Sequence, residues 1–311
     1  MAGPSISSEL TAFLPNYWDT VLGENLYPNL YFYQFGTKRT VPRNFGNTIK
    51  IPRLQKQNIV TSVSTANEGV AIGTCPISDE FISGTMTQFA GAYKHSDVLV
   101  MTALSDVIEL SLIDIARDLA KRMDTHVRDT ISGTGVAISA SAAVGTTILK
   151  PADIIQAVVT LDTADNPRPA DNHYPCIVHP KTVYDIQTNL SGGAWLDVTK
   201  YHDANDRLYI GEVGRMYGAR FVTSSNILQT QSLSAAISGA CNFMFAPDSY
   251  YVTEISDMTA KTYVKQLGSS GTADPVNQIA TVGAKVYFGV VTATWDSNEA
   301  RIVRLRHQLT L

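Results

Sequence analysis

The chain has 311 residues, of which 44% are hydrophobic and only 17% charged, and its formal net charge is −4. This length gives ample core for one elaborated domain or for two or three domains, and it excludes a minimal scaffold. Average soluble proteins carry about 25% charged residues, so uncharged polar side chains or other copies of the chain must cover much of the surface. Duplex binding needs a strong basic field, so the charge argues against nucleic acid as the main partner.

Neither a disulfide framework nor a membrane segment is indicated. Cys75, Cys176 and Cys241 lie far apart without a CxxC pair, which predicts buried free thiols in a reducing compartment. The first residues lack the basic start and apolar run of a signal peptide, and no segment has the roughly 18 apolar residues of a membrane span. We therefore expect a soluble protein made in the cytoplasm, with no membrane partner.

The first 36 residues form an aromatic, polar arm with little periodicity. Disordered tails are normally depleted in aromatic residues, so we expect this arm to lie on an apolar surface of its own domain or of a neighbour. Its aromatic residues are Phe13, Tyr17, Trp18, Tyr27, Tyr31, Phe32, Tyr33 and Phe35.

A projecting β-ribbon is predicted next. Thr48 to Leu54 partly alternates as a strand does, and Pro52 confines it to an edge or a ribbon. Phe81 to Met101 alternates again, so the simplest ribbon leaves the body near Gly46 and returns near Phe89. A two-stranded ribbon is marginal in isolation, and the next subunit of an assembly is the nearest candidate for its support. The stretch from 38 to 56 has only basic charges: Lys38, Arg39, Arg43, Lys50, Arg53 and Lys56.

One long amphipathic helix is predicted from Ser105 to Gly133. Ser105 is placed to cap the first turn, and Gly133 is placed to supply a left-handed stop. At ~1.5 Å per residue the helix would be about 40 Å long. Its apolar stripe is Ile108, Leu112, Ile115, Leu119, Met123, Val127 and Ile131, and its expected solvent-side pairs are Asp118 with Arg122 and Asp124 with Arg128.

The chain after this helix mixes helices and strands. Residues 133–145 are predicted to form a hinge or an ordered glycine-rich turn. From Pro151 to about Ile255 the pattern predicts a compact α+β domain, with helices opening at Pro151 and Pro180 and a buried strand at 176–178. The last β-type runs, 285–294 and 299–309, predict a terminal hairpin packed on the long helix.

No motif for catalysis or for cofactor or metal binding is present. Phosphate-loop, GxSxG and HExxH patterns are absent, and the glycines of GEVGRMYG predict a tight turn rather than a dinucleotide site. Arg304 and Arg306 share one strand face, which we expect to be solvent-exposed. We assign no catalytic, cofactor-binding or metal residue and expect no cofactor. The histidines, none with ligand spacing, are His95, His126, His173, His179, His202 and His307.

Several local segments resemble, in sequence and order, the coat-protein family typified by an N4-like podophage. They extend from about Gly46 to Thr294 and read GNTIKIPRL, ANEGVAIG, MTQFAGAYKHSDVL, YPCIVHPKTVYDI and YIGEVGRMYGARFVTSSN. The layout is likewise similar to the major capsid protein of tailed bacteriophages, with a lambdoid-type capsid fold. That fold combines an N-terminal arm, an extended β-ribbon loop, a long spine helix, an axial α+β domain and C-terminal β-strands on the spine.

The resemblance implies an α+β fold with definite domain limits. Residues 1–45 would be the N-terminal arm and 46–89 the extended β-ribbon loop that lies over a neighbouring subunit. Residues 90–150 and 256–311 would form the peripheral domain, with the spine helix at 105–132. Residues 151–255 would form the axial domain, which meets its copies around capsomer centres.

The resemblance also implies a function and a set of partners. The chain would be a structural protein and not an enzyme, and it would assemble with itself, as hexamers and pentamers, into the icosahedral virion shell around a double-stranded DNA genome. A scaffolding protein and a portal would take part in assembly, and a decoration protein is a further candidate partner. Packaged DNA would be contacted only weakly and non-specifically. Because a long charged helical N-terminal extension is lacking, we expect the scaffolding protein to be a separate chain.

The predicted ribbon carries the candidate interface residues. We expect Lys50, Arg53 and Lys56 to set the register against an acidic patch of the next subunit, with Glu68 at the ribbon turn as a further contact. No lysine–asparagine crosslinking pair is identifiable. The alternatives are an encapsulin-like compartment shell, an α+β enzyme without a recognisable motif, and a tail or adhesion protein, which the single long helix fits poorly.

Overall fold

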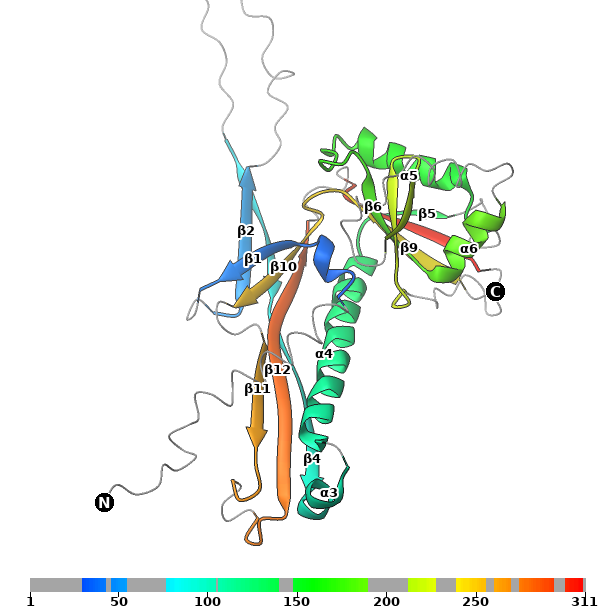
Figure 1. The fold of residues 1–311 in the computed structure, drawn as a ribbon. Helices are drawn as coiled ribbons and strands as arrows, with labels where there is room; N and C mark the ends of the chain where they lie inside the picture. The colour runs from blue at the N-terminus through cyan, green and yellow to red at the C-terminus, as the bar shows by residue number, and fades with distance from the viewer. Residues whose placement is uncertain are drawn as a thin grey trace, which may run out of the picture.

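The computed structural model describes residues 30–42, 46–54, 77–104, 106–139, 148–189, 212–227, 239–255, 260–269, 274–293 and 300–309. They form an elongated body along one long helix, with a second sheet and further helices at one end (Figure 1). None of the described helices is long and apolar enough to cross a membrane.

The helical elements are η2 (Tyr33–Phe35), α3 (Asp97–Thr102), α4 (Val107–Ser132), α5 (Pro151–Thr163) and α6 (Pro180–Asn189). The strands are β1 (Thr37–Val41), β2 (Thr48–Leu54), β3 (Asp79–Thr85), β4 (Thr87–Ser96), β5 (Val136–Ser139), β6 (Tyr174–Val178), β7 (Glu212–Met216), β8 (Ala219–Thr223), β9 (Gly239–Phe245), β10 (Tyr250–Ile255), β11 (Ala260–Lys265), β12 (Ile279–Thr292) and β13 (Ile302–Gln308).

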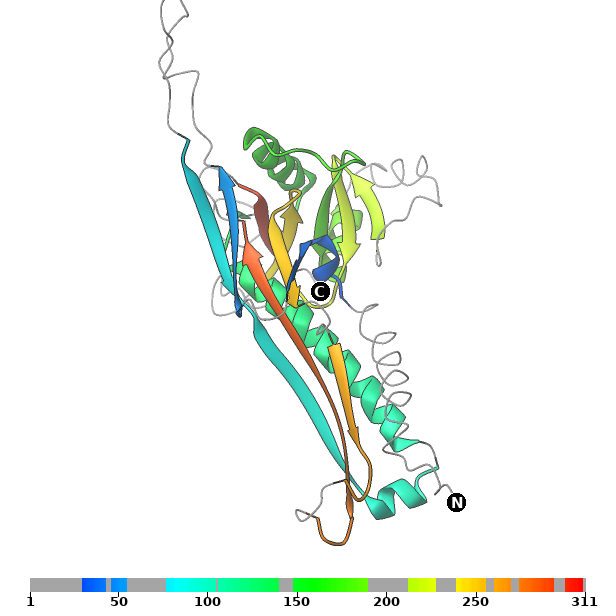
Figure 2. The ribbon, with the colours of Figure 1, turned by 90° about the vertical axis from the view of Figure 1, so that its left-hand side faces the viewer.

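The first sheet is built around β12 and lies along α4. Its strand order is β1-β10-β12-β11, and β4 pairs with β12 as well. Alternate residues of β12, among them Val282, Val286 and Phe288, are buried with the apolar stripe of α4. Figure 2 shows β12, β4 and the helix running side by side along the body. One core therefore holds the long strand and the long helix together.

The predicted spine helix is present, with corrected ends. Every member of the predicted stripe except the partly buried Ile108 is buried. The N-cap is Asp106, whose Oδ1 accepts the N–H groups of Ile108 and Glu109, while Ser105 lies outside the described residues. Gly133 has φ −77°, so the predicted left-handed stop is wrong, and a positive φ of 85° occurs instead at Gly135.

The C-terminal end of α4 is held by an arginine of the second sheet. Arg304 of β13 donates to the carbonyl oxygens of Ser132 and Gly135, where a positive charge complements the helix dipole. Partial burial lowers the pKa of the Arg304 guanidinium from its usual value, although it remains a cation. The prediction of a solvent-exposed face at this residue is therefore wrong.

The second sheet has the order β5-β13-β9-β6-β8-β7 and is covered on both faces. One face packs with α5 and α6 in a core that includes Ile154, Ile186 and Leu305. The other face, which includes Ile177 and Phe243, joins the core of α4. The predicted helix starts at Pro151 and Pro180 and the buried strand at 176–178 are confirmed.

The predicted terminal hairpin is wrong. The strand β12 pairs with β4, β10 and β11, whereas β13 pairs with β5 and β9 in the other sheet. Ile302, Val303 and Leu305 are all buried, because β13 is a central strand with apolar layers on both faces. A hairpin laid on one helix would have left one of these faces exposed.

Two local predictions also change. The predicted hinge contains the strand β5, which pairs in parallel with β13. The run predicted to alternate up to Met101 ends instead in α3, which Ser96 caps by accepting the N–H of Leu99. The predicted tight turn in GEVGRMYG is confirmed, since Tyr217 and Gly218 both have positive φ between the antiparallel strands β7 and β8.

Two leucines of α4 test whether this core supports the fold. Leu112 is fully buried, whereas Leu110 is 54% exposed. Leu112→Ala should lower the free energy of unfolding by about 2–5 kcal/mol because it leaves a cavity. Leu110→Ala, the matched control, should change it by less than about 0.5 kcal/mol. Urea denaturation of the unassembled protein measures both, and equal losses would contradict the packing described for α4.

Candidate interaction surfaces

The β-ribbon predicted from the sequence is confirmed at its base. The strands β2 and β3 pair antiparallel, from Thr48 opposite Thr85 to Leu54 opposite Asp79. Residues 55–76, with Lys56 and Glu68, lie outside the described residues. The structure therefore places two of the four candidate interface residues, Lys50 and Arg53.

These two residues occupy opposite faces of the ribbon. Lys50 is on the exposed face, where its Nζ lies 4.8 Å from the ring centroid of Phe81. Phe81 and Leu54 on the same face are 59% and 68% exposed. Arg53 is on the half-buried face and pairs with Glu80 directly opposite, with 2.5 Å between Nε and Oε1. The outward face thus offers apolar surface and one lysine, while Arg53 has a partner within its own chain.

The inward face of the ribbon rests on the first sheet. Ile49, Ile51 and Ile82 pack on Tyr251 and Val291. At Gly84 a Cβ would lie 2.2 Å from a methyl group of Val291, so glycine is what permits this close approach. Burial raises the pKa of the Tyr251 hydroxyl, as expected beneath the ribbon. The ribbon base is therefore supported by its own chain, and only its outward face is left for a partner.

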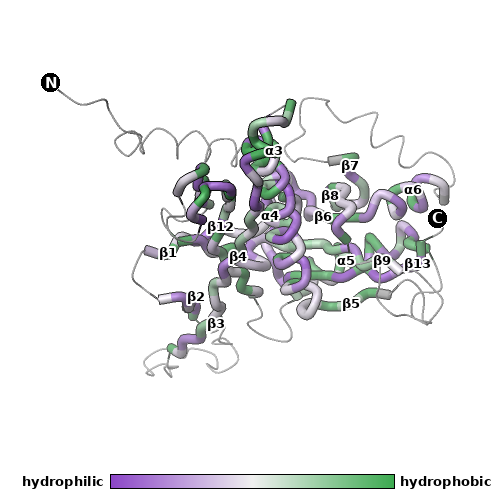
Figure 3. The backbone as a smooth tube through the Cα atoms, turned by 90° about the horizontal axis from the view of Figure 1, so that it is seen from below, coloured by the Kyte–Doolittle hydropathy of each residue, from purple (hydrophilic) through white to green (hydrophobic). Residues whose placement is uncertain are grey.

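An exposed apolar patch lies at the opposite end of the body, around α3. No residue of α3 is buried, and Figure 3 shows this helix as strongly hydrophobic at the end of the body. Val98, Met101, Leu104 and Val276 are 64%, 76%, 106% and 72% exposed. Apolar patches of this kind mark protein interaction sites. The alternation up to Met101 predicted a strand and not this patch, although Ser96-Asp97 is a helix-start signal.

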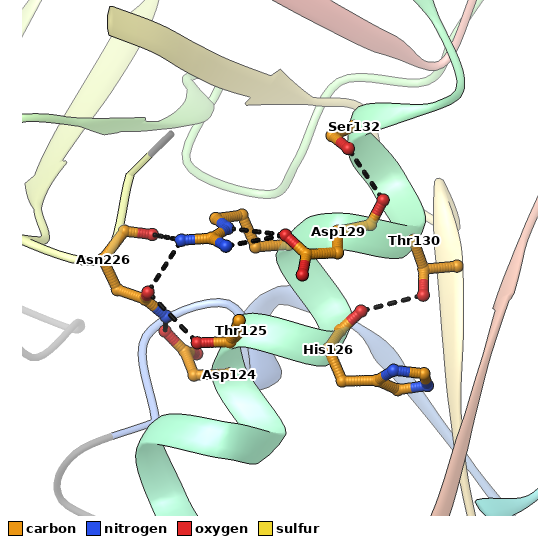
Figure 4. A network of polar contacts seen from close by, with 8 residues as sticks. Asp124, Thr125, His126, Asp129, Thr130, Ser132 and Asn226 are labelled. Carbon is orange, nitrogen blue, oxygen red and sulfur yellow. Dashed lines mark hydrogen bonds and ion pairs between the residues drawn. The ribbon is translucent and has the colours of Figure 1, made fainter. Parts of the chain in front are cut away.

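A buried polar network joins three parts of the chain, and Figure 4 shows its contacts between α4 and Asn226. Asp124 of α4 accepts the backbone N–H of Phe32 through Oδ1 at 2.7 Å and the side-chain amide of Asn226 through Oδ2 at 3.0 Å. Asn226 in turn accepts from Thr125 and from Arg128. The network fixes the end of the N-terminal arm and the loop after β8 onto the spine helix.

Asp124 is only 1% exposed, which overturns the predicted solvent-side pair with Arg128. Desolvation raises the pKa of its carboxyl from 3.8 to about 6, against the opposing effect of its hydrogen bonds to Asn226 and Phe32. Helical spacing placed this residue near the polar face, and no local pattern indicates that Phe32, 92 positions away, covers it.

The described residues show no group of three or more His, Cys, Asp or Glu side chains that could hold a metal ion. The three buried histidines of the described residues make hydrogen bonds: His95 with Ser111, His179 with the backbone N–H of Lys181, and His307 with Thr182. A groove of about 530 Å³ runs between β1 and β2, lined partly by Arg39 and Lys50. Residues 43–45, which join these strands, lie outside the described residues, so we assign the groove no ligand.

The buried carboxyl of Asp124 predicts a measurable pH dependence. A folded-state pKa near 6, above the value of 3.8 for an exposed carboxyl, means that the folded state binds the proton more tightly. The contribution of this group to stability therefore rises as pH falls from about 7 towards 4, by roughly 2–3 kcal/mol.

The variant Asp124→Asn cannot titrate, so the stability of the wild type relative to it should increase over this pH range. Urea denaturation of the two unassembled proteins at pH 7.5 and pH 5 measures this difference. A difference that does not change with pH would show that this carboxyl keeps an ordinary pKa.

The similarity of this chain to known proteins is found in its structure and not in its sequence. No family model matches the sequence, and no curated protein matches it. Among solved structures, the capsid of Ralstonia phage GP4 is similar with a TM-score of 0.69 and 10% identity, over 89% of this chain and 88% of that chain. The capsid of the cyanophage P-SCSP1u is similar with a TM-score of 0.63 and 15% identity, over 89% and 88%.

A protein compartment has a similar fold. The SrpI encapsulin of Synechococcus elongatus PCC 7942 is similar with a TM-score of 0.58 and 7% identity, over 92% of this chain and 90% of that chain. The fold class expected from the sequence is confirmed, whereas the narrower resemblance to an N4-like coat protein stays a prediction. The chain has the α+β fold of tailed-phage capsid proteins, which encapsulin shares.

Proposed function

We propose that the chain is the major capsid protein of a tailed bacteriophage, which assembles with itself into the icosahedral shell around a double-stranded DNA genome. The observation that carries this proposal is the extent of the match to phage capsids, which covers 89% of this chain and 88% of theirs. The match takes in the whole layout and not a single common motif. In this role the chain acts by binding its own copies and not by catalysis.

The shape and surface of the molecule support self-assembly. The body is long and narrow, and the exposed apolar residues at its two ends lie on the ribbon and around α3. A monomer would leave both in water, whereas packing between copies would bury them. The low charged fraction of 17% suits a surface that is largely covered by other subunits.

We propose domain limits that follow the sheets. The peripheral part comprises α3, α4 and the sheet of β1, β4, β10, β11 and β12, and the axial part comprises α5, α6 and the sheet of β5–β9 and β13. Compared with the limits expected from the sequence, β5 and β13 move to the axial part, and β1 and β10 move to the peripheral part. Residues 1–36 keep their proposed role as arm, and residues 46–86, with β2 and β3, keep their proposed role as extended loop.

The proposed partners follow from the role. Copies of the chain would form hexamers and pentamers, and a scaffolding protein and portal would guide closure of the shell. Contact with packaged DNA would be weak, since the net charge is −4. The mature protein would be located in the virion after synthesis in the host cytoplasm.

An encapsulin-like compartment is the second candidate, because the encapsulin match covers 92% of the chain. The phage capsids reported above match with higher TM-scores, and the local sequence segments resemble a phage coat family. Double-stranded DNA or a portal that copurifies with the particles would favour the virus, whereas a protein cargo would favour the compartment.

The direct test is the size of the expressed protein, alone and with a candidate scaffolding protein. Light scattering and negative-stain microscopy should show closed particles tens of nanometres across or ring-shaped capsomers. A stable compact monomer under both conditions would overturn the proposal and favour an enzyme with an unrecognised site.

The ribbon lysines provide a second test. Arg53 pairs with Glu80 in its own chain, so the proposed register against an acidic patch now rests mainly on Lys50 and Lys56. The double variant Lys50→Glu/Lys56→Glu should reduce particle yield several-fold while the monomer keeps its wild-type unfolding midpoint, because the reversed charges would repel the partner. The charge-preserving Lys50→Arg/Lys56→Arg is the control and should assemble normally. Normal yield from the reversed variant would refute the role of these lysines.

A further inference from the structure

Apart from His95, lysine is the only ionisable basic or acidic residue type among Asp, Glu, Lys, Arg and His in the strands β4, β11 and β12. They contain Lys94, Lys261, Lys265 and Lys285 and neither Asp nor Glu. Thr281 of β12 lies opposite both Lys94 and Lys265, and Lys285 lies opposite Lys261. Because opposite residues share a face and side chains alternate along a strand, these lysines all lie on one face of the sheet. We call it the lysine face.

The lysine face is the side of the sheet away from α4. The alternate residues of β12, including Val282 and Val286, are buried in the core with that helix. Strands lie ~4.8 Å apart and alternate residues ~6.8 Å apart, so the lysine positions span roughly 10 by 14 Å. This is an area that an extended peptide segment can cross.

The centre of the lysine face is shallow and partly aromatic. Gly283 lies between Tyr263 and Ala92, and Ala90 lies beside Lys285. The Nζ of Lys285 lies 4.8 Å from the ring centroid of Tyr263 and 5.8 Å from that of Tyr287. Tyr263 remains 45% exposed. The face therefore combines a floor of small residues with aromatic rings and ammonium groups.

Its charge is not balanced within these strands. Lys261 and Lys285 are direct cross-strand neighbours, and like charges in that position destabilise a sheet. The described carboxylates at the end of the sheet, Asp97 and Asp274, accept the backbone N–H groups of Val98 and Ile279. An anionic partner would be attracted to the ammonium groups of the lysine face.

We propose that the lysine face is the docking site for residues 1–29 of the N-terminal arm of a neighbouring copy, an inference that rests on the proposed function. These residues include Glu9, Asp19 and Glu24 and no Lys, Arg or His, so their side-chain charge complements the lysines. Its aromatic residues, which include Tyr17 and Trp18, suit the small floor and tyrosine rings of the face.

The arm begins on the side of its own sheet that is opposite its own lysine face. Leu30, the first described residue of the arm, is buried in the core on the α4 side of the sheet, opposite the lysine face. An extended segment of 29 residues reaches at most ~100 Å, well beyond the ~39 Å of a helix as long as α4. A neighbouring copy is within that reach.

A nucleic-acid phosphate backbone would also be attracted to lysines. The arm is the favoured occupant because it is tethered to every subunit, which gives it an effective concentration in the millimolar range inside an assembly. A free polyanion has no such advantage, and it would meet a chain whose net charge is −4.

Carbodiimide crosslinking of assembled particles tests the proposal, since the reagent joins a carboxylate to a lysine amine with loss of water. Particles assembled from mixed ¹⁴N- and ¹⁵N-labelled chains should give crosslinks between Glu9, Asp19 or Glu24 and the lysine face, with the two isotopes in one product. Mass spectrometry reads both the site and the isotope composition.

The matched control replaces all four lysines of the face by arginine. This variant keeps the positive charge, so it should assemble normally, but it lacks the reactive amines and should lose these crosslinks. Crosslinks confined to one isotope, or to another protein, or none in intact wild-type particles, would overturn the inference alone. Crosslinks of the lysine face to DNA phosphate in place of the arm would do the same. Absence of particles from the wild-type chain would overturn the proposed function and this inference together.

Discussion

The structure depends on the burial of one face of β12 against the apolar stripe of α4. Burial of each large apolar side chain contributes roughly 1.5–3 kcal/mol. This interface includes Leu112 and Met123 of α4 together with Val286 and Phe288 of β12. The remaining strands of the first sheet are added to β12, and the second sheet is attached at the C-terminal end of the helix through Ile177, Phe243 and Arg304. A molecule this narrow has little other core along its length.

Local sequence patterns predicted where helices, strands and turns occur, but they did not predict which of these elements pack together. The stripe of α4, the helix starts at Pro151 and Pro180, the turn at Tyr217-Gly218 and the ribbon pairing all follow from spacing and turn chemistry within short stretches. The placement of β12 and β13 in different sheets does not follow from such patterns. A β-type run has the same sequence pattern in a hairpin and in the centre of a sheet. The pairing of β13 with β5 and β9 distinguishes the two, and this pairing depends on segments that are distant in the sequence.

The candidate surfaces show the same limit. The alternation of the ribbon was visible in the sequence, but not that Arg53 and Lys50 face opposite ways with different partners. The lysines of β4, β11 and β12 lie up to 191 positions apart, between Lys94 and Lys285, and only strand register brings them to one face. The net charge of the chain therefore does not reveal such a surface.

The ribbon and the spine helix share one strand. The ribbon base rests on Val291 near the end of β12, while earlier residues of the same strand pack on α4, which Arg304 ties to the second sheet. β12 thus connects the ribbon base to α4, and α4 in turn is connected to the second sheet. In the proposed shell, a neighbouring copy that displaced the ribbon would therefore also shift β12 against α4.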